Sequence, residues 1–311
     1  MPLDPVAVNH LEMLARANLP SPAAGSVGEA RELLVRRLAL FPDCRPEVAH
    51  IEDRAVPGPT GDTPVRVYTP ANRGPFPIIV YFHGGGWVIG SIETHDALAR
   101  HLANAAECVV MSVDYRRAPE DPFPAAVNDA YAATAWAAHN GAEIGGDGSR
   151  LVVAGDSAGG NLAAVVSLMA RDRGEPAIAF QLLMCPITDC DFETASYREN
   201  AAGYLLTRGV MQWAWDRYCP RVDDRTHPHA SPLRATSLAG LPPAYVITAE
   251  FDPLKSEGEA YANRLRDAGV PTTLRDYPGL IHGFIGLPGI YPQAVAAIRD
   301  AATTLRAALG G

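Results

Sequence analysis

Short apolar runs alternate with amphipathic stretches over most of this 311-residue chain. Several runs are apolar at nearly every position, which is typical of strands covered on both faces. The alternation predicts right-handed crossovers and a mostly parallel sheet flanked by helices, an α/β fold. The expected strands are Pro64–Tyr68, Ile78–Phe82, Val109–Val113, Leu151–Ala154, Phe180–Met184, Ala244–Ala249 and Thr272–Asp276, and the expected helices are Asp96–Ala106, Ala125–His139, Ala158–Ala170, Glu257–Ala268 and Ala294–Leu309.

Residues 1 to about 45 depart from this alternation. Ser26 and Glu29 have the spacing of a capping box, in which a serine and a glutamate satisfy each other's backbone N–H groups at a helix start. Leu33, Leu34 and Leu38 follow on one side of the helix that this predicts. The segment therefore indicates a helix that stands outside the repeating strand–helix units.

The segment of about 190–225 also lacks a strand pattern, and its Met211, Trp215 and Tyr218 are spaced for one helical face. Two helical segments outside the alternation suggest a cap subdomain, formed by 1–45 and about 190–225, over the sheet. The alternative is a set of peripheral helices packed on the core. No repeat or linker divides the chain, so we expect a single domain over 1–311, with Val56–Pro64 as a surface turn.

Composition and charge exclude several classes of function. The net charge is −9 and no basic stripe is visible, which argues against a nucleic-acid partner. No run of about 18 apolar residues predicts a membrane span, and the N-terminus has no secretory pattern. The cysteines are odd in number and form no C-x-x-C pair, so we expect reduced thiols in a cytoplasmic protein. Cys185 and Cys190 could bind a metal in principle, but two thiols alone do not make a zinc site, and no metal is expected.

The most informative segment is Leu151–Gly160, with the sequence LVVAGDSAGG. A strand leads into G-x-S-x-G and then into a helix, which is the pattern of a nucleophile elbow around Ser157. Gly155 and Gly159 fit this turn because a side chain at either position would collide with the neighbouring strand or helix. The turn places Ser157 at a helix N-terminus, where partial positive charge favours a developing anion. The alternative is a turn of small residues with a passive serine.

A second glycine-rich run, His83-Gly84-Gly85-Gly86-Trp87, directly follows an expected strand. No Lys-Ser/Thr follows it, so it is not a phosphate-binding P-loop. Upstream of an elbow serine, it predicts an oxyanion hole, whose backbone donors need the close approach that glycine allows. We expect the N–H groups of Gly84, Gly85 and Ala158 to be the donors, His83 to brace the loop, and Trp87 to line the substrate pocket with Met211 and Trp215. For Trp87, plain packing in the core is the alternative.

Three histidines follow Ser157: His227, His229 and His282. His227 and His229 lie in a polar loop and are expected to be solvated, although their H-x-H spacing leaves a metal site as an alternative. His282 follows the last expected strand and precedes Gly283, at the carboxyl edge of the sheet. Its ordinary pKa of about 6.5 suits proton transfer at neutral pH. His282 is therefore the expected general base.

The acid of the triad should lie between Ser157 and His282 in the chain. Asp252 is the first choice, because it follows the strand Ala244–Ala249, where active sites of α/β proteins form. It would hold the imidazole in the productive tautomer and stabilise the imidazolium. Asp276 lies within a strand pattern and is expected to face elsewhere, and Asp189 and Asp191 are the reserves.

Together these residues resemble the hormone-sensitive lipase family of α/β-hydrolases, its bacterial esterases in particular. The resemblance implies an α/β-hydrolase fold with a mostly parallel eight-stranded sheet and a helical cap, no cofactor or metal, and in many members a homodimer. It also implies a structural role for Tyr115–Glu120. The matching segments cover about two hundred residues: His83–Trp87, Tyr115–Glu120, Gly155–Gly160, Asp252–Leu254 and His282–Phe284.

The sequence therefore predicts a serine carboxylesterase that hydrolyses small-molecule esters of short to medium acyl chain through an acyl-enzyme on Ser157. An amidase, lactonase or deacetylase on the same triad is one alternative, because the pocket and not the triad selects the leaving group. A non-catalytic receptor on this fold is another, although a receptor has no need of Ser157, Asp252 and His282 together.

Overall fold

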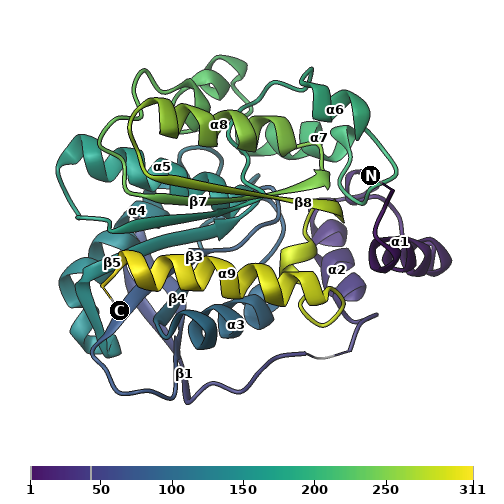
Figure 1. Ribbon diagram of the computed structural model, residues 1–311. Coiled ribbons are helices and arrows are strands. Elements are labelled where there is room, and N and C mark those ends of the chain that lie inside the picture. Colours follow the sequence, from purple (N-terminus) through teal and green to yellow (C-terminus); the bar gives the residue numbers. More distant parts are fainter. Residues whose placement is uncertain (1, 43, 311) are drawn as a thin grey trace.

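One mixed sheet of eight strands forms the centre of the computed structural model, which describes residues 2–42 and 44–310 (Figure 1). The strand order is β1-β2-β4-β3-β5-β6-β7-β8. β1 and β2 form an antiparallel hairpin, β2 is antiparallel to β4, and all other pairs are parallel. The strands are β1 His50–Gly58, β2 Gly61–Thr69, β3 Phe76–Phe82, β4 Val109–Val113, β5 Gly146–Asp156, β6 Phe180–Met184, β7 Ala244–Phe251 and β8 Thr272–Ile281.

Helices cover both faces of this sheet. Alternate residues of β3 explain the arrangement: Ile78 and Val80 belong to the core on one face, and Ile79 and Tyr81 to the core on the other. Because both faces are buried, the strand has the sequence FPIIVYF, in which the hydroxyl of Tyr81 is the one polar side-chain group. On one face lie α4 (Ala125–Asn140), α5 (Ala158–Arg173) and α8 (Lys255–Asp267), and on the other α3 (Asp96–Ala106) and α9 (Pro292–Ala308) (Figure 1).

The expected strands and helices of the alternating part all occur in the structure, and β4, β6 and α3 have the expected ends. β1 is the strand that the pattern missed. It is an edge strand whose side chains are largely exposed, so its sequence HIEDRAVPG carries no apolar run. The stretch Val56–Pro64, expected to be a plain surface turn, instead spans the ends of both hairpin strands, which are paired from Gly58 and Gly61 outward.

Four helices stand outside the alternation and lie together at the carboxyl ends of the parallel strands (Figure 1). The capping box is confirmed, because Ser26 and Glu29 satisfy each other's backbone N–H groups at the start of α2. A further helix, α1, is capped by Asp4, whose side chain accepts from the N–H of Val6 at 2.8 Å. The four are α1 Pro5–Ala17, α2 Val27–Leu38, α6 Ala195–Glu199 and α7 Arg208–Tyr218.

Arg31 holds α2 to the body of the protein. Its Nε donates to the backbone oxygen of Val88 at 2.9 Å and its Nη2 to that of Ala118 at 3.1 Å. The guanidinium also makes a bidentate pair with Glu120, at 2.8 and 2.7 Å. The fork of an arginine suits such multiple contacts, so this single side chain fixes α2 beside the loop that follows β3.

Tyr115 supports the loop that follows β3 through contacts with His83. Its hydroxyl donates to the backbone oxygen of His83 at 2.7 Å, and its ring stacks on that of His83 with centroids 4.4 Å apart. The role that the resemblance implies for Tyr115–Glu120 is therefore seen in the structure: the segment holds the loops around the carboxyl ends of the strands.

The remaining regular segments are short 3₁₀ turns in the connections. Among the described residues, none of the helices is long and apolar enough to cross a membrane. The 3₁₀ turns are η1 Pro22–Ala24, η2 Glu93–His95, η3 Gly141–Ile144, η4 Val222–Thr226, η5 Pro232–Arg234 and η6 Phe284–Gly286.

Candidate active site

Ser157 sits on a strained turn between β5 and α5. Its backbone has φ 54° and ψ −117°, a conformation that non-glycine residues rarely adopt. The flanking glycines are required by close backbone approach: a Cβ on Gly155 would lie 2.2 Å from the backbone of Gly159, and one on Gly159 would lie 1.9 Å from the carbonyl oxygen of Phe82. The turn therefore packs α5 tightly on β3 and β5 and raises the serine hydroxyl above the sheet edge.

The structure brings together the three residues selected as a triad. Nε2 of His282 lies 3.1 Å from Oγ of Ser157, and Nδ1 of His282 lies 2.7 Å from Oδ2 of Asp252. Oδ1 of Asp252 accepts the backbone N–H of Leu254 at 2.8 Å, so both oxygens of this buried carboxylate are engaged. His282 follows β8 directly, and Asp252 follows β7, so the carboxyl ends of neighbouring strands deliver the groups.

The electrostatics of the site favour a basic imidazole. Burial on its own disfavours the imidazolium of His282, but the negative charge and hydrogen bond of Asp252 outweigh it, so the pKa of His282 is raised above 6.5. Asp156 adds to this in the same direction. His282, paired with Asp252, is therefore suited to accept a proton from Ser157.

The other carboxylates considered for the acid are occupied elsewhere. Oδ1 of Asp189 accepts from Nε of Arg234 at 2.5 Å. Asp191 accepts the backbone N–H of Glu193 at 2.8 Å. Asp276 accepts from the hydroxyl of Thr248 at 2.9 Å and pairs with Lys255. None of the three has a described contact with His282.

The glycine run after β3 lies beside Ser157, but the structure corrects the choice of donors within it. The N–H of Gly84 donates to Oδ1 of the buried Asp156 at 3.1 Å, and is therefore not available to a substrate. Gly85 and Gly86 line the cavity above Ser157, and their N–H groups donate to no acceptor among the described residues. Gly86 was missed, because three successive glycines in a sequence do not tell which N–H groups face the cavity.

Ala158 begins α5 directly after Ser157, so its N–H is one of the first-turn donors that have no partner within a helix. Gly85 has φ 115°, and a Cβ on it would lie 2.1 Å from the backbone oxygen of Ile89. Only glycine fits this position. The loop and the helix start thus present three unpaired backbone donors, from Gly85, Gly86 and Ala158.

A cavity of about 210 Å³ opens over Ser157 and His282. Its walls are mainly apolar and come from the helices outside the alternation: α1, α2 and α7 all contribute. Of the three aromatic or thioether residues expected to line it, Met211 does. Trp213, which the sequence reasoning did not select, lies on the wall as well.

Trp87 and Trp215 do not lie on the cavity wall; they belong to the hydrophobic core. Both are completely buried, with the ring of Trp87 stacked on that of Tyr218 at 3.9 Å between centroids and Trp215 edge-on to Trp87 at 5.0 Å. This aromatic cluster ties the loop after β3 to α7. The spacing of Met211, Trp215 and Tyr218 predicts that they share one face of a helix. It does not predict whether that face lines the cavity or packs in the core, and Trp215 and Tyr218 pack in the core.

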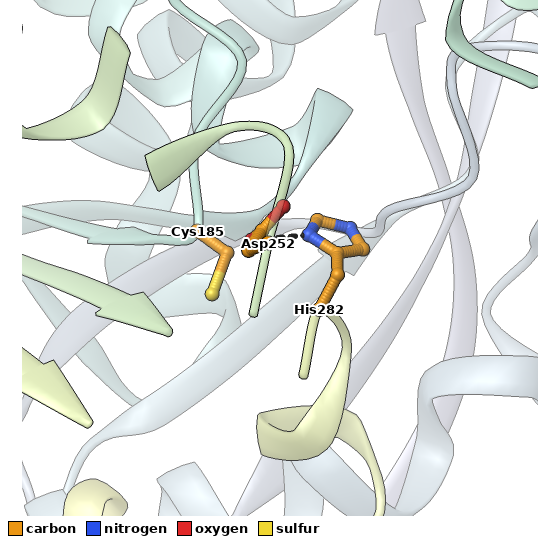
Figure 2. A group of neighbouring side chains, drawn as sticks. All are labelled: Cys185, Asp252 and His282. Carbon is orange, nitrogen blue, oxygen red and sulfur yellow. Dashed lines mark hydrogen bonds and ion pairs between the residues drawn. The ribbon is translucent and has the colours of Figure 1, made fainter. Parts of the chain in front are cut away.

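Cys185 lies beside the acid and the base, as Figure 2 shows. Its Sγ, a carboxylate oxygen of Asp252 and a ring nitrogen of His282 lie within 4.8 Å of one another, the one group of three potential metal ligands in the described part of the chain. Burial and the neighbouring Asp252 hold the pKa of the Cys185 thiol well above its usual value. An ion here would need the thiolate and the Nδ1 of His282, which the hydrogen bond to Asp252 already uses, so these residues fit a triad better than a metal site.

The other ligand pairs considered from the sequence do not converge. Cys190 is half-buried, with its N–H bonded to Asp189 at 2.8 Å, and is not part of the group around Cys185. The N–H of His229 donates to Nδ1 of His227 at 3.0 Å, which shows a local turn rather than two nitrogens directed at an ion.

The known proteins that this chain is similar to are hydrolases. A family described as alpha/beta hydrolase fold matches residues 79–286. Carboxylesterase NlhH of Mycobacterium tuberculosis is 44% identical over 293 residues, covering 92% of this chain and 91% of its own, and an arylesterase of Saccharolobus solfataricus is 38% identical over 299 residues, covering 96% and 97%.

Solved structures agree with the sequence relatives. A thermostable esterase from Pseudomonas putida superposes with a TM-score of 0.94 at 43% identity, covering 99% of this chain and 98% of its own. An ester hydrolase from the metagenome of Lake Arreo gives a TM-score of 0.95 at 42% identity, covering 99% and 100%. The chain therefore belongs to the α/β-hydrolase fold family, in its hormone-sensitive lipase-like branch.

Proposed function

We propose that this protein is a serine carboxylesterase that hydrolyses small esters through an acyl-enzyme on Ser157. The observation that carries the proposal is the continuous hydrogen-bond chain from Oγ of Ser157 through His282 to Asp252, at the floor of an apolar cavity. The esterases named among the relatives and structural neighbours support the same activity.

In the proposed first step, Oγ of Ser157 forms a bond to the ester carbonyl carbon while Nε2 of His282 takes the hydroxyl proton. The tetrahedral intermediate then collapses, the bond to the alcohol oxygen breaks, and His282 gives its proton to the leaving alcohol. Water repeats the sequence on the acyl-enzyme, which releases the acid and regenerates Ser157. Asp252 holds the imidazole tautomer and offsets the positive charge that His282 carries between the proton transfers.

The backbone N–H groups of Gly85, Gly86 and Ala158 are the donors that we propose for the oxyanion. Two observations support this assignment. The three N–H groups have no acceptor among the described residues, and they lie beside Ser157. Donors fixed in this way act on charge that appears in the transition state, and the loss of one lowers the rate by roughly a hundred- to a thousandfold in comparable sites.

The helices α1, α2 and α7 serve, in this proposal, as a cap that excludes water and shapes the acyl pocket. Met211 and Trp213 supply apolar wall, and the cavity of about 210 Å³ suits short to medium acyl chains. The cysteines form no disulfide within the described residues, which supports the cytoplasm as the location. A homodimer stays a prediction that rests on the family resemblance.

The test is a series of p-nitrophenyl esters from acetyl to palmitoyl, with Ser157→Ala run beside the wild type. We expect turnover that is highest at short or medium chains and absent in Ser157→Ala. A folded wild-type protein that hydrolyses none of the esters would refute the proposal and direct attention to amide or lactone substrates. Activity that survives in Ser157→Ala would assign the chemistry to another residue.

A further inference from the structure

The wall of the catalytic cavity is apolar except for a few residues, and one of them is Arg37 on α2. Arg37 is half-buried, and its Nε is buried without a hydrogen-bond partner. Its Nη2 donates to the backbone oxygen of Pro20 at 3.0 Å. No carboxylate among the described residues pairs with it. A cation that is partly withdrawn from water without a counter-charge is unfavourable, and this partial burial lowers the pKa of Arg37.

The two other arginines of α2 differ from Arg37 in their partners and their exposure. Arg31, on the same helix, has its bidentate pair with Glu120, whereas Arg36 is exposed to solvent and is not part of the cavity wall. Of the three, Arg37 is the one that lines the cavity above Ser157 and has no carboxylate partner among the described residues.

A second donor group lies beside Arg37. The ring of His10, on α1, is buried on the cavity wall, and its Nδ1 lies 2.7 Å from the hydroxyl of Tyr291. Burial, and then the positive charge of Arg37, lower the pKa of His10 to about 4, so the ring is neutral at working pH. When Tyr291 donates to Nδ1, the ring proton is on Nε2, which makes no hydrogen bond to a described residue. The pair can then offer N–H donors from both residues.

The remaining carboxylate on the cavity wall does not compensate Arg37. Oδ1 of Asp156 accepts from the hydroxyl of Tyr81 and the N–H of Gly84, and its Oδ2 lies 3.5 Å from Nε2 of His95. Its charge is used on the floor of the site, beneath the glycine run. The cavity therefore combines apolar walls with a cation that has no carboxylate partner in the described part of the chain.

We propose that Arg37, assisted by His10, binds a carboxylate carried by the ester substrate, so that this enzyme prefers esters with a free acid group over neutral esters of the same size. The inference rests on the esterase activity proposed above and names its substrate class. The carboxylate can be on the acyl chain, as in a half ester of a dicarboxylic acid, or on the alcohol. A guanidinium and a carboxylate form paired, charge-assisted hydrogen bonds, which are the strong ones in such apolar surroundings.

The kinetic test compares two matched pairs of esters by titration of the released acid. Monoethyl suberate against ethyl octanoate places the carboxylate on the acyl chain, and 6-acetoxyhexanoate against hexyl acetate places it on the alcohol. The quantity measured is the ratio of kcat/KM for the charged and the neutral member. The variants are Arg37→Gln, Arg37→Lys and, as the matched control on the same helix, Arg36→Gln.

In at least one pair, we expect Arg37→Gln to lower this ratio about tenfold or more, mainly through KM, as the loss of a hydrogen bond to a charged group implies. Arg37→Lys should recover part of the ratio, and Arg36→Gln should leave it unchanged. A ratio unaffected by Arg37→Gln in both pairs overturns the inference, as does an equal loss in Arg36→Gln, which would indicate general attraction by surface charge.

A binding measurement separates this inference from the proposed activity. In the Ser157→Ala background, which cannot form the acyl-enzyme, the charged esters are titrated calorimetrically with and without Arg37→Gln. Weaker binding of about tenfold in the double variant supports the carboxylate site whether or not the wild type turns the ester over. Equal binding of charged and neutral esters to Ser157→Ala overturns the site and leaves the activity on neutral esters standing.

Discussion

Asp252→Asn is the substitution whose effect the geometry defines most sharply. Oδ1 of Asp252 accepts the backbone N–H of Leu254 at 2.8 Å, and Oδ2 accepts from Nδ1 of His282 at 2.7 Å. An asparagine of the same shape must keep its oxygen on the N–H of Leu254, because an NH₂ group there would face another donor. Its NH₂ group then faces Nδ1 of His282.

The imidazole would respond by placing its proton on Nε2, where it faces Oγ of Ser157 at 3.1 Å. In that tautomer His282 cannot accept the serine proton. The corresponding change in the best-studied serine triad lowers kcat by about 10⁴, which is about 5.5 kcal/mol of transition-state stabilisation. We expect a loss of this order in kcat with p-nitrophenyl butyrate, a nearly unchanged KM and a nearly unchanged melting temperature.

The matched control is Asp276→Asn, which removes a charge from the neighbouring strand β8 at a carboxylate bonded to Thr248 and Lys255. It should retain kcat within a few-fold. If Asp252→Asn keeps more than about a tenth of the wild-type kcat while remaining folded, Asp252 is not the acid of the triad, and Asp189 and Asp191 return as candidates.

Three further predictions concern pH and stability. Because the pKa of His282 is raised above 6.5 and the base must be neutral, kcat/KM should rise with pH with a midpoint above 6.5; a midpoint below 6 would contradict the role of Asp252. Gly159→Ala places a Cβ 1.9 Å from a backbone oxygen and should cost about 1–3 kcal/mol or more in chemical denaturation, whereas Gly28→Ala, whose Cβ meets nothing closer than 3.9 Å, should be neutral or stabilising. Arg31→Gln removes the guanidinium that holds α2 to the protein, so it should lower both the melting temperature and kcat/KM; an unchanged kcat/KM would show that α2 does not shape the site.

The central part of the fold could be predicted because its signals are local. β3 and the second half of β5, Leu151–Ala154, are buried on both faces and therefore mainly apolar, and the elbow at Ser157 needs glycines that only close backbone packing explains. β1 could not be found in this way, since an edge strand facing solvent has no apolar pattern to detect. The triad followed from chain order and strand ends, which are also sequence properties.

The details that failed depend on side-chain and backbone direction. Gly84 and Gly86 cannot be distinguished from the sequence. The hydrogen bond from the N–H of Gly84 to Asp156 is what shows that this N–H is not free to bind a substrate. Trp215 packs on the core while Trp213 faces the cavity, because the orientation of α7 is set by tertiary contacts. Arg37 is indistinguishable from Arg36 until packing turns one of them into the cavity.

In the proposed mechanism, Ser157 forms the covalent intermediate. The most direct test of this role is to react the protein with a p-nitrophenyl alkylphosphonate and locate the adduct by mass spectrometry of the peptides. We expect one phosphonyl group per chain, on Ser157, with complete loss of esterase activity and no adduct in Ser157→Ala. An inactivated enzyme with the adduct on another residue, or an active enzyme that stays unmodified, would contradict this role of Ser157.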